Sequence, residues 1–235
     1  KIAKALIKLG DNFKQKDHEI FNKLENISGK IIDGRKNAFP GEVISDFLQE
    51  NKNFFPKLEE FANQIFDKVK QNNRTRYIAL CQFLKDEYGI TVKDVIPKEG
   101  KPFSKIYKVK DKELLLSDYL SLETKKLFAA AQISQEGASK EIDEYLATFN
   151  FPTEESKKLT RVALLNYCGA AILMPYSLFH KECKELKYDL ELLQNTFATS
   201  FEQVAHRVTC LQDPKLPGIP FHFLRVDVAG NISKR

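Results

Sequence analysis

The sequence of 235 residues predicts an α+β fold that is mainly helical, with a small antiparallel sheet in mid-chain and a β-hairpin near its C-terminal end. Three observations support this prediction. Apolar residues recur at helical spacing up to residue 88 and again from residue 122 onward. Between these regions, short segments are separated by Pro, Gly and Asp-Lys turn signals, as in a small sheet. Close to the C-terminus, two strand-like segments flank a turn at residues 228–231.

The first 39 residues are predicted to form a connector helix and a loop. Apolar residues at spacings of three and four indicate an amphipathic helix over residues 1–28, with a weak point near Lys16 and Asp17. Gly29 and Gly34 then indicate a loop. The helix could connect to an upstream domain, pair with a second copy of the chain, or pack as an ordinary core helix. Because the first residue is Lys, we expect the chain to be part of a longer protein.

Three further helices precede the predicted sheet. Pro40 opens a helix that runs to Leu48, because proline is favoured at the first helical position. Residues 57–70 and 76–88 place their apolar residues on one helical face, and Gly89 ends the second of these helices as a cap glycine. The sheet is expected to form from residues 90–92, 105–109 and 113–116.

The second half of the chain is predicted to be helical up to residue 211. Thr153 and Ser200 are good N-cap residues, and Ser200 with Gln203 has the form of a capping box. A strand at residues 221–226 and a return strand from residue 232 form the predicted hairpin. The predicted helices span residues 122–136, 139–148, 154–173, 176–186, 189–197 and 201–211.

Composition and charge are those of an ordinary globular protein. Hydrophobic residues make up 43% and charged residues 29%, the formal net charge is +5, and Lys is spread along the whole chain. A solvated surface explains this pattern better than a nucleic-acid surface. The four Cys occur singly, so we expect reduced thiols in a cytoplasmic protein rather than a disulfide framework. There is no signal peptide and no apolar run of about 18 residues, so no membrane span is expected.

The last third of the chain carries the most informative motifs. They are LLNYCGAAILMP at residues 164–175, FATSFEQVAHRV at residues 197–208, GIPFHFLRVD at residues 218–227 and AGNISKR at residues 229–235. Their order resembles bacterial transcription regulators of the short-chain fatty-acyl type, which belong to the XRE family. The sensor domain of those regulators is built on the ImmA/IrrE metallopeptidase fold.

The resemblance implies three regions in this chain. Residues 1–39 would be the connector or dimerisation helix with its loop, and residues 40–200 a pseudo-metallopeptidase sensor domain. Residues 201–235 would be the start of the C-terminal region that is specific to the regulators. The resemblance is strongest over the last 76 residues, from position 160 onward.

The metal-binding positions of that fold are replaced in this chain. In ImmA/IrrE peptidases the first motif helix is similar to FTLAHELGH, and the third ligand is a Glu just before the Asn of EANxFAAxLLMP. In this chain Ala131 falls at the first His, Gln135 at the second His and Leu164 at the third ligand, and Gln132 falls at the Glu that serves as the base. Ala and Leu cannot bind zinc, and neutral amides are poor ligands for it. The resemblance therefore implies a degenerate zincin core that holds no metal and is not an enzyme.

The cleft that loses its metal has two alternative fates. Ala131, Leu164 and Cys168, with Gln132 and Gln135 at the edge, could line a pocket for a short acyl chain and its carbonyl. Alternatively, side chains fill the cleft. The residues alone do not decide between these alternatives, and the resemblance favours the pocket.

A bound acyl-CoA would need donors for its phosphate groups and aromatic surface for its adenine. Arginine binds phosphate bidentately, and helix N-termini add backbone N–H groups. Each arginine alone is more often part of a structural ion pair. The candidate phosphate-binding residues are Arg76, Arg161, Arg207 and Arg225. The candidate adenine-stacking residues are Tyr107, Tyr167, Phe221 and His222, and Tyr77 is a further candidate ligand-binding residue next to Arg76.

Residues 189–208 also resemble a helix-turn-helix that reads DNA. Its second helix would present Gln203, His206 and Arg207 to a groove. The ImmA/IrrE peptidases carry the same pattern as a structural feature, so the resemblance favours a packing role. The alternative function is a DNA-binding or protein–protein module that senses no ligand.

Taken as a whole, the resemblance implies the ligand-sensing and dimerising part of a transcriptional regulator. The expected ligand is CoA or a short-chain acyl-CoA of the acetyl or propionyl class. The chain is expected to form a homodimer and to control promoter DNA binding by a helix-turn-helix domain that precedes residue 1. An iron–sulfur cluster is expected only on cysteines beyond Arg235, because the four Cys of this chain are too dispersed.

Overall fold

The computed structural model describes residues 40–70, 75–98, 103–223, 225–226 and 232–234. The predicted connector over residues 1–39 and the predicted turn at residues 228–231 lie outside the described residues. The fold is α+β and mainly helical, as predicted. Its elements are α2 (Pro40–Glu50), α3 (Pro56–Lys70), α4 (Arg76–Tyr88), β1 (Thr91–Val95), β2 (Lys105–Lys108), β3 (Glu113–Ser117), α5 (Leu122–Gly137), α6 (Ser139–Ala147), α7 (Glu154–Leu173), α8 (Tyr176–Glu185), α9 (Leu190–Phe197), α10 (Phe201–Thr209), β4 (Arg225–Val226) and β5 (Ile232–Lys234).

The three-stranded sheet is mixed, which corrects the prediction of an antiparallel sheet. Its strand order is β1–β3–β2, and β3 pairs parallel with β1 and antiparallel with β2. Leu114 and Leu116 of β3 are fully buried, whereas Lys93 of β1 and Lys108 of β2 are exposed. The most apolar strand therefore takes the centre. The lysine-bearing strands form the edges, where charge discourages pairing with other chains.

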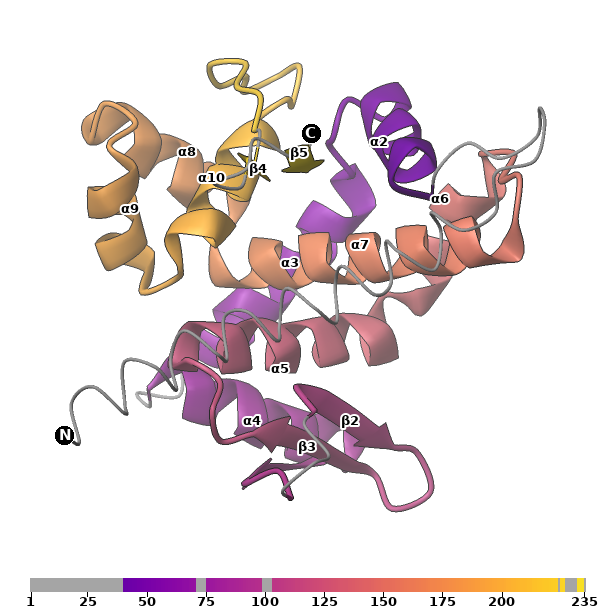
Figure 1. The fold of residues 1–235 in the computed structure, drawn as a ribbon. Coiled ribbons are helices and arrows are strands. Elements are labelled where there is room, and N and C mark those ends of the chain that lie inside the picture. Colours follow the sequence, from indigo (N-terminus) through magenta and orange to yellow (C-terminus); the bar gives the residue numbers. More distant parts are fainter. Residues whose placement is uncertain (1–39, 71–74, 99–102, 224, 227–231, 235) are drawn as a thin grey trace, which may run out of the picture.

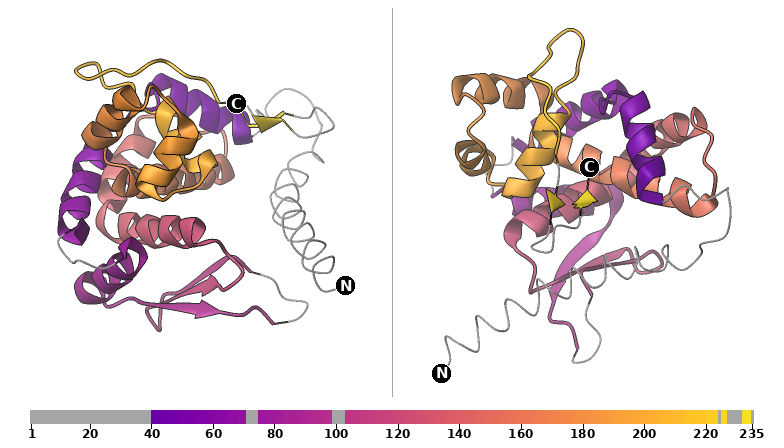
Figure 2. Two further views of the ribbon diagram at one scale, coloured as in Figure 1. Left: turned by 90° about the vertical axis from the view of Figure 1, so that its left-hand side faces the viewer. Right: turned by 45° about the horizontal axis from the view of Figure 1, so that its top comes forward.

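The helices form layers on one side of this sheet. Figure 1 shows α5 between the sheet and α7, with α4 beside α5. At the C-terminal end of α7 lie α8, α9 and α10, and at its N-terminal end lie α2 and α6. The side view in Figure 2 shows the same order, with the sheet at one end of the molecule and the α8–α10 group at the other. α7 is thus the central helix, and it contributes side chains to both buried apolar clusters.

Several predicted helix ends are confirmed by their caps. Gly89 adopts a left-handed conformation with φ of 70° at the end of α4, and Thr153 caps α7. The Ser200 hydroxyl accepts from Gln203 N at 3.2 Å, and Gln203 Oε1 accepts from Ser200 N at 3.1 Å, which completes the predicted capping box. α10 ends at Thr209, two residues before its predicted end.

The C-terminal hairpin is confirmed, but its first strand is shorter than predicted. β4 and β5 pair antiparallel, and residues 221–223 precede β4 without belonging to a strand. Among the described helices, none is by itself long and apolar enough to cross a membrane. α7 and α8 together reach that length and composition, but they are bent by 65° to each other.

Candidate ligand site

The former metal positions lie on α5 and α7, and their side chains do not suit a metal ion. Ala131 is almost fully buried, and Leu164 is packed among Phe47, Phe55 and Ile142. The zinc that the fold family implies therefore has no ligand at either position. Within the part of the chain that the structure describes, no three His, Cys, Asp or Glu side chains are grouped so that they could hold a metal ion.

Gln132, at the position of the former base, and Gln135, at that of the second metal-binding His, form hydrogen bonds near the end of α5. Gln132 Nε2 donates to Glu136 Oε1 at 2.8 Å, and Gln135 Nε2 donates to Ser139 Oγ at 3.2 Å. Tyr107 of β2 lies beside Glu136, and burial together with that carboxylate raises the pKa of Tyr107. The structure thus brings Gln132 and Tyr107 together at Glu136, a residue that no sequence motif indicated.

α5 and α7 touch backbone to backbone at Gly169. A Cβ atom on Gly169 would lie 2.9 Å from Ala131 N and 3.3 Å from Leu127 O. The EANxFAAxLLMP motif has Ala at this position, so Gly allows a closer approach here. The neighbouring Cys168 is fully buried, and burial raises the pKa of its thiol to about 12. Both observations favour a filled cleft over an acyl pocket at Ala131 and Leu164.

A buried ion pair connects α10 to α3. The Arg207 side chain is 1% exposed, and its Nη1 and Nη2 donate to Glu59 Oε1 and Oε2 at 2.6 and 2.7 Å. Tyr167 OH donates to Glu59 Oε1 at 2.5 Å, and Arg207 Nε donates to Met174 O at 2.9 Å. Burial disfavours the charged form of Arg207, but the Glu59 carboxylate raises its pKa above the ordinary value. The polar groups of Arg207 and Tyr167, which were predicted to bind a ligand, are therefore hydrogen-bonded inside the protein.

α10 is arranged for packing rather than for reading DNA. Besides capping its own helix, Gln203 donates from Nε2 to Glu123 O at 3.3 Å. The His206 ring lies 4.5 Å from the Phe223 ring, measured between centroids. Three side chains of α10 were candidates for contacting a DNA groove, and two of them, Gln203 and Arg207, form hydrogen bonds within the protein instead.

A cavity of 240 Å³ lies beside Arg76 at the start of α4, and we call it the Arg76 cavity. Arg76 Nη1 donates to Leu173 O at 2.7 Å, and its guanidinium group lies over the Phe66 ring, 5.1 Å from the centroid. Burial lowers the pKa of Arg76, but arginine remains charged in proteins. Among the described residues, the lining combines two cationic side chains with apolar ones: Phe66, Val69, Lys70, Arg76, Leu80 and Ile172.

Only Arg76 of this lining was predicted from the sequence. Phe66, Leu80 and Ile172 occupy apolar helical positions, and such positions give the same signal whether they line a cavity or fill a core. The sequence offered one indication, the Arg76-Tyr77 pair at the start of the helix. There a guanidinium group and the free backbone N–H groups of the helix N-terminus can both donate hydrogen bonds to a phosphate.

A second cavity, of 480 Å³, lies between α3 and α8 and has the opposite character. Carboxylates of Glu59, Glu60, Asp67 and Asp213 line it, beside the aromatic ring of Tyr176. No Lys or Arg is among the described residues of its lining. Its charge is therefore unsuited to the phosphate groups of a CoA.

Arg161 and Tyr77, two other predicted ligand-binding residues, do not line the Arg76 cavity, and each pairs with an aspartate instead. Arg161, in the first half of α7, forms an ion pair with Asp143. The Tyr77 hydroxyl donates to Asp94 Oδ1 at 2.9 Å, and burial raises the pKa of Tyr77. For Arg161, this is the structural ion pair that the sequence left open as an alternative to phosphate binding.

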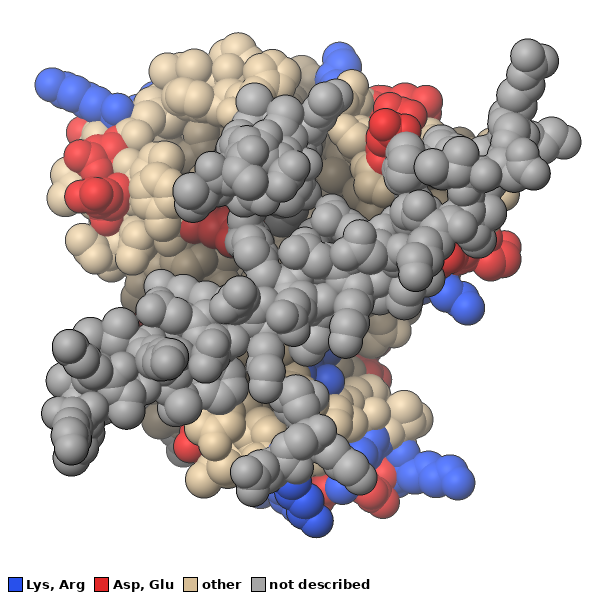
Figure 3. Space-filling view, in the orientation of Figure 1, with Lys and Arg blue, Asp and Glu red and all other residues tan. Residues whose placement is uncertain are grey.

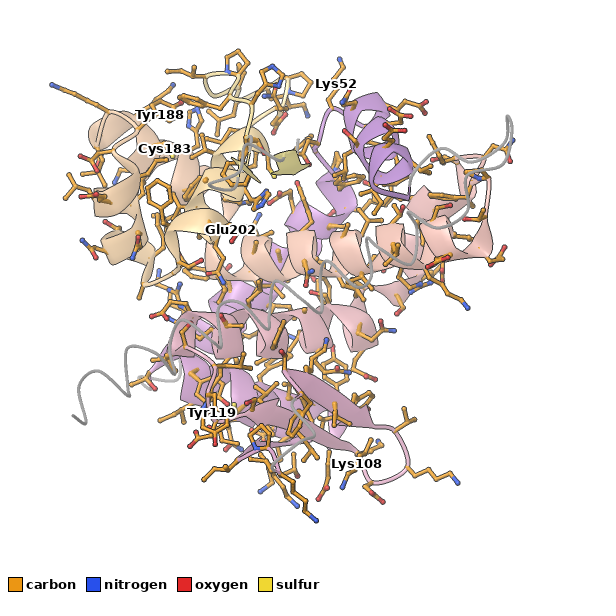
Figure 4. The ribbon with its side chains drawn as sticks, in the orientation of Figure 1. Lys52, Lys108, Tyr119, Cys183, Tyr188 and Glu202 are labelled. Carbon is orange, nitrogen blue, oxygen red and sulfur yellow. The ribbon has the colours of Figure 1, made fainter. Side chains whose placement is uncertain are left out.

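The predicted stacking residues of the C-terminal region are also distant from the sheet residue Tyr107. The Phe221 ring packs on Tyr188, 5.4 Å between centroids, and His222 is exposed. Arg225 belongs to β4. Figure 4 shows Tyr188 at the α8–α9 end of the molecule and Lys108, which follows Tyr107, at the opposite end beside the sheet. The structure therefore does not gather the predicted adenine-stacking residues in one place.

Charge is unevenly distributed over the described surface. On the face shown in Figure 3, Lys and Arg side chains gather at the sheet end, and Asp and Glu side chains lie over α9 and α2. Lys93 and Lys108 both pair with Glu113, so part of the positive charge is neutralised locally. Such an arrangement is typical of a solvated surface.

Comparison with known proteins identifies the fold family. Residues 85–209 match the IrrE N-terminal-like domain, and residues 210–235 match the C-terminal region of short-chain fatty acyl coenzyme A regulators. A solved structure of a Mycobacterium tuberculosis transcriptional regulator has a TM-score of 0.77 and 34% identity, over 84% of this chain and 60% of that chain.

Curated relatives show the same relationship. The HTH-type transcriptional regulator PrpR of Mycobacterium tuberculosis is 34% identical over 83% of this chain and 40% of its own length. RamB of that species is 30% identical over 84% of this chain and 42% of its own. The propionyl-CoA carboxylase regulator of Cereibacter sphaeroides is 46% identical over 36% of this chain and 18% of its own. The chain thus spans less than half the length of these relatives. The resemblance found in the sequence is confirmed, and the chain belongs to the IrrE N-terminal-like domain family.

Proposed function

We propose that this chain is the ligand-sensing part of a bacterial transcriptional regulator that responds to a short-chain acyl-CoA and catalyses no reaction. PrpR and RamB are transcriptional regulators, which supports the class of protein. The match of residues 210–235 to short-chain fatty acyl coenzyme A regulators supports the class of ligand. The replaced metal ligands support a role without catalysis. A homodimer, promoter contact through another domain and a cytoplasmic location belong to the same proposal.

The Arg76 cavity is the observation that carries this proposal. Its 240 Å³ is below the range of about 300–1,000 Å³ that holds a whole drug-sized ligand. It therefore suits one part of a larger ligand, such as a short acyl chain against Leu80 and Ile172. Arg76 and Lys70 would then face the anionic part of the same molecule, because guanidinium and ammonium groups bind phosphate.

Native mass spectrometry and calorimetry of the purified chain test this proposal. We expect one propionyl-CoA or acetyl-CoA per chain. Arg76→Ala should weaken both acyl-CoA and free CoA by about tenfold or more, because a hydrogen bond to a charged group contributes roughly 1.5–3 kcal/mol. Lys158→Ala, which removes an exposed cation from the first turns of α7, is the matched control. No binding of any of these ligands at millimolar concentration would contradict the proposal.

The alternative function, a DNA-binding module that senses nothing, receives less support from the geometry. Arg207 would have to reach a groove, but its side chain is buried against Glu59. A gel-shift titration separates the two functions. Tight, salt-sensitive DNA binding by this chain alone would favour the alternative.

A further inference from the structure

Contacts from two distant helices meet where α7 ends and α8 begins. Arg76 Nη1 donates to Leu173 O, the last carbonyl of α7, at 2.7 Å, and Arg207 Nε donates to the next carbonyl, Met174 O, at 2.9 Å. Tyr176 is the first residue of α8. We call residues 173–176 the α7–α8 junction. Two cations thus satisfy carbonyl groups that the end of a helix leaves without partners.

Tyr176 connects this junction to residues 211–223, which we call the C-terminal segment. The Tyr176 hydroxyl donates to Leu216 O at 3.0 Å and accepts from Asp213 N at 2.9 Å. The Arg207 guanidinium group lies over the Tyr176 ring, 5.8 Å from its centroid. Tyr176 therefore contacts the buried ion pair with its ring and the C-terminal segment with its hydroxyl.

Two more side chains hold the C-terminal segment against α8 and the loop that follows it. His180 Nε2 lies 3.1 Å from Pro217 O, and Tyr188 OH accepts from Ile219 N at 3.2 Å. Because His180 belongs to α8 itself, a shift at the start of α8 would act on two anchors of the segment at once. The match to the C-terminal region of the regulators begins at residue 210, so this segment leads directly into that region.

We propose that the α7–α8 junction couples the Arg76 cavity to the C-terminal segment, with Arg76 and Tyr176 at the two ends of the connection. The inference rests on the proposed function, because the ligand is the acyl-CoA assigned to the cavity. The physical cause is competition for Arg76. A phosphate carries a full negative charge and can bind a guanidinium group with two parallel hydrogen bonds, so it attracts Arg76 more strongly than the neutral Leu173 O, which accepts a single bond. A ligand that binds Arg76 in place of Leu173 O removes one hydrogen bond from the α7–α8 junction. The junction, including Tyr176, then becomes more mobile, and the hydrogen bonds of the Tyr176 hydroxyl to Asp213 N and Leu216 O are weakened.

Amide hydrogen exchange of the whole chain tests the coupling without any ligand. Arg76→Gln removes the cation that holds Leu173 O, and it should raise the exchange rates of the Asp213 and Ile219 amides by about fivefold, the effect of roughly one hydrogen bond. Lys158→Gln, which removes one exposed cation from α7, should change these rates less than about twofold. Unchanged Asp213 and Ile219 exchange in a folded Arg76→Gln protein would overturn the proposal.

A reciprocal variant keeps the test valid if Arg76→Gln does not fold. Tyr176→Phe deletes only the hydroxyl group and keeps the buried ring. Because coupling acts in both directions, this variant should raise the exchange of the Arg76 guanidinium protons by about twofold or more. If these protons keep the rate of the unmodified protein, the coupling does not exist.

Added propionyl-CoA separates the failure of the coupling from the failure of the proposed function. If calorimetry shows binding and the C-terminal segment exchanges faster with ligand, both are supported. If the ligand binds but exchange in residues 211–223 is unchanged, the coupling is wrong and the proposed function stands. If no ligand binds, the proposed function fails, and the two ligand-free variants still decide whether the junction connects Arg76 to Tyr176.

Discussion

Replacing Arg207 with Ala should destabilise the fold by about 3–5 kcal/mol. The magnitude follows from the burial of the pair: the side chains of Arg207 and Glu59 are 1% and 6% exposed, and two hydrogen bonds of 2.6 and 2.7 Å join them. Removing one partner leaves the other charge buried without compensation, which costs roughly that amount. For a chain of this size, it corresponds to a fall in Tm of roughly 6–20 °C.

Urea unfolding followed by circular dichroism measures this loss, and a double-mutant cycle assigns it to the ion pair. Glu59→Leu alone and Arg207→Met alone should be similarly destabilising, because each leaves the charge of the other residue uncompensated. Glu59→Leu combined with Arg207→Met removes both charges and should recover most of the lost stability. The coupling between the two sites should therefore exceed about 2 kcal/mol.

Two results would refute this reasoning. An Arg207→Ala protein within about 1 kcal/mol of the unmodified protein would mean that the charge of Glu59 is not confined to a buried site. Additive single losses in the double variant would mean that the two side chains do not act as a pair. A longer regulator that carries the folded double variant should also keep its promoter specificity, and loss of specificity would favour DNA reading by α10.

Three further predictions concern packing, capping and metal. Gly169→Ala should destabilise the chain by about 1–3 kcal/mol in urea unfolding, because its Cβ would lie 2.9 Å from a backbone nitrogen of α5, whereas Gly41→Ala, with no atom within 4 Å, should be neutral or stabilising. Ser200→Ala should cost about 1 kcal/mol in the same assay through loss of its cap, and no measurable loss would contradict the capping box. Elemental analysis should find no stoichiometric zinc, because Ala and Leu replace the ligands, and one zinc per chain would contradict the fit of these residues.

The local features of this fold could be predicted because they are encoded by neighbouring residues. Gly89, Thr153 and the Ser200 capping box each report on the conformation of their own turn, and all three are confirmed. The order of the strands could not be predicted in the same way. β3 lies between β1 and β2 because Leu114 and Leu116 need the most buried position, and that competition is decided by the whole sheet.

The candidate site was less predictable because its key contacts join distant parts of the chain. Glu59 and Arg207 are 148 positions apart, and neither position alone indicates that the two side chains meet. Arg207 was therefore predicted to be a phosphate ligand, whereas the structure places it in a buried pair. Arg76 was predicted as a phosphate-binding residue, and the structure places it beside a cavity. Its contact with Leu173 O could not be predicted, because that contact depends on how α4 packs against the end of α7.

The most direct test of the central claim is calorimetric titration of propionyl-CoA and free CoA against the unmodified chain and Val69→Phe. Val69 lines the Arg76 cavity, and the larger ring should occupy the space that we assign to the acyl chain. About two buried methylene-sized groups, at roughly 0.8 kcal/mol each, correspond to a loss of about tenfold or more for propionyl-CoA. Free CoA should lose less than about twofold, and Val162→Phe, the same change at a position that is 51% exposed on α7, should alter neither affinity. Equal losses for both ligands, or no loss for either in a folded Val69→Phe protein, would contradict acyl binding in the Arg76 cavity.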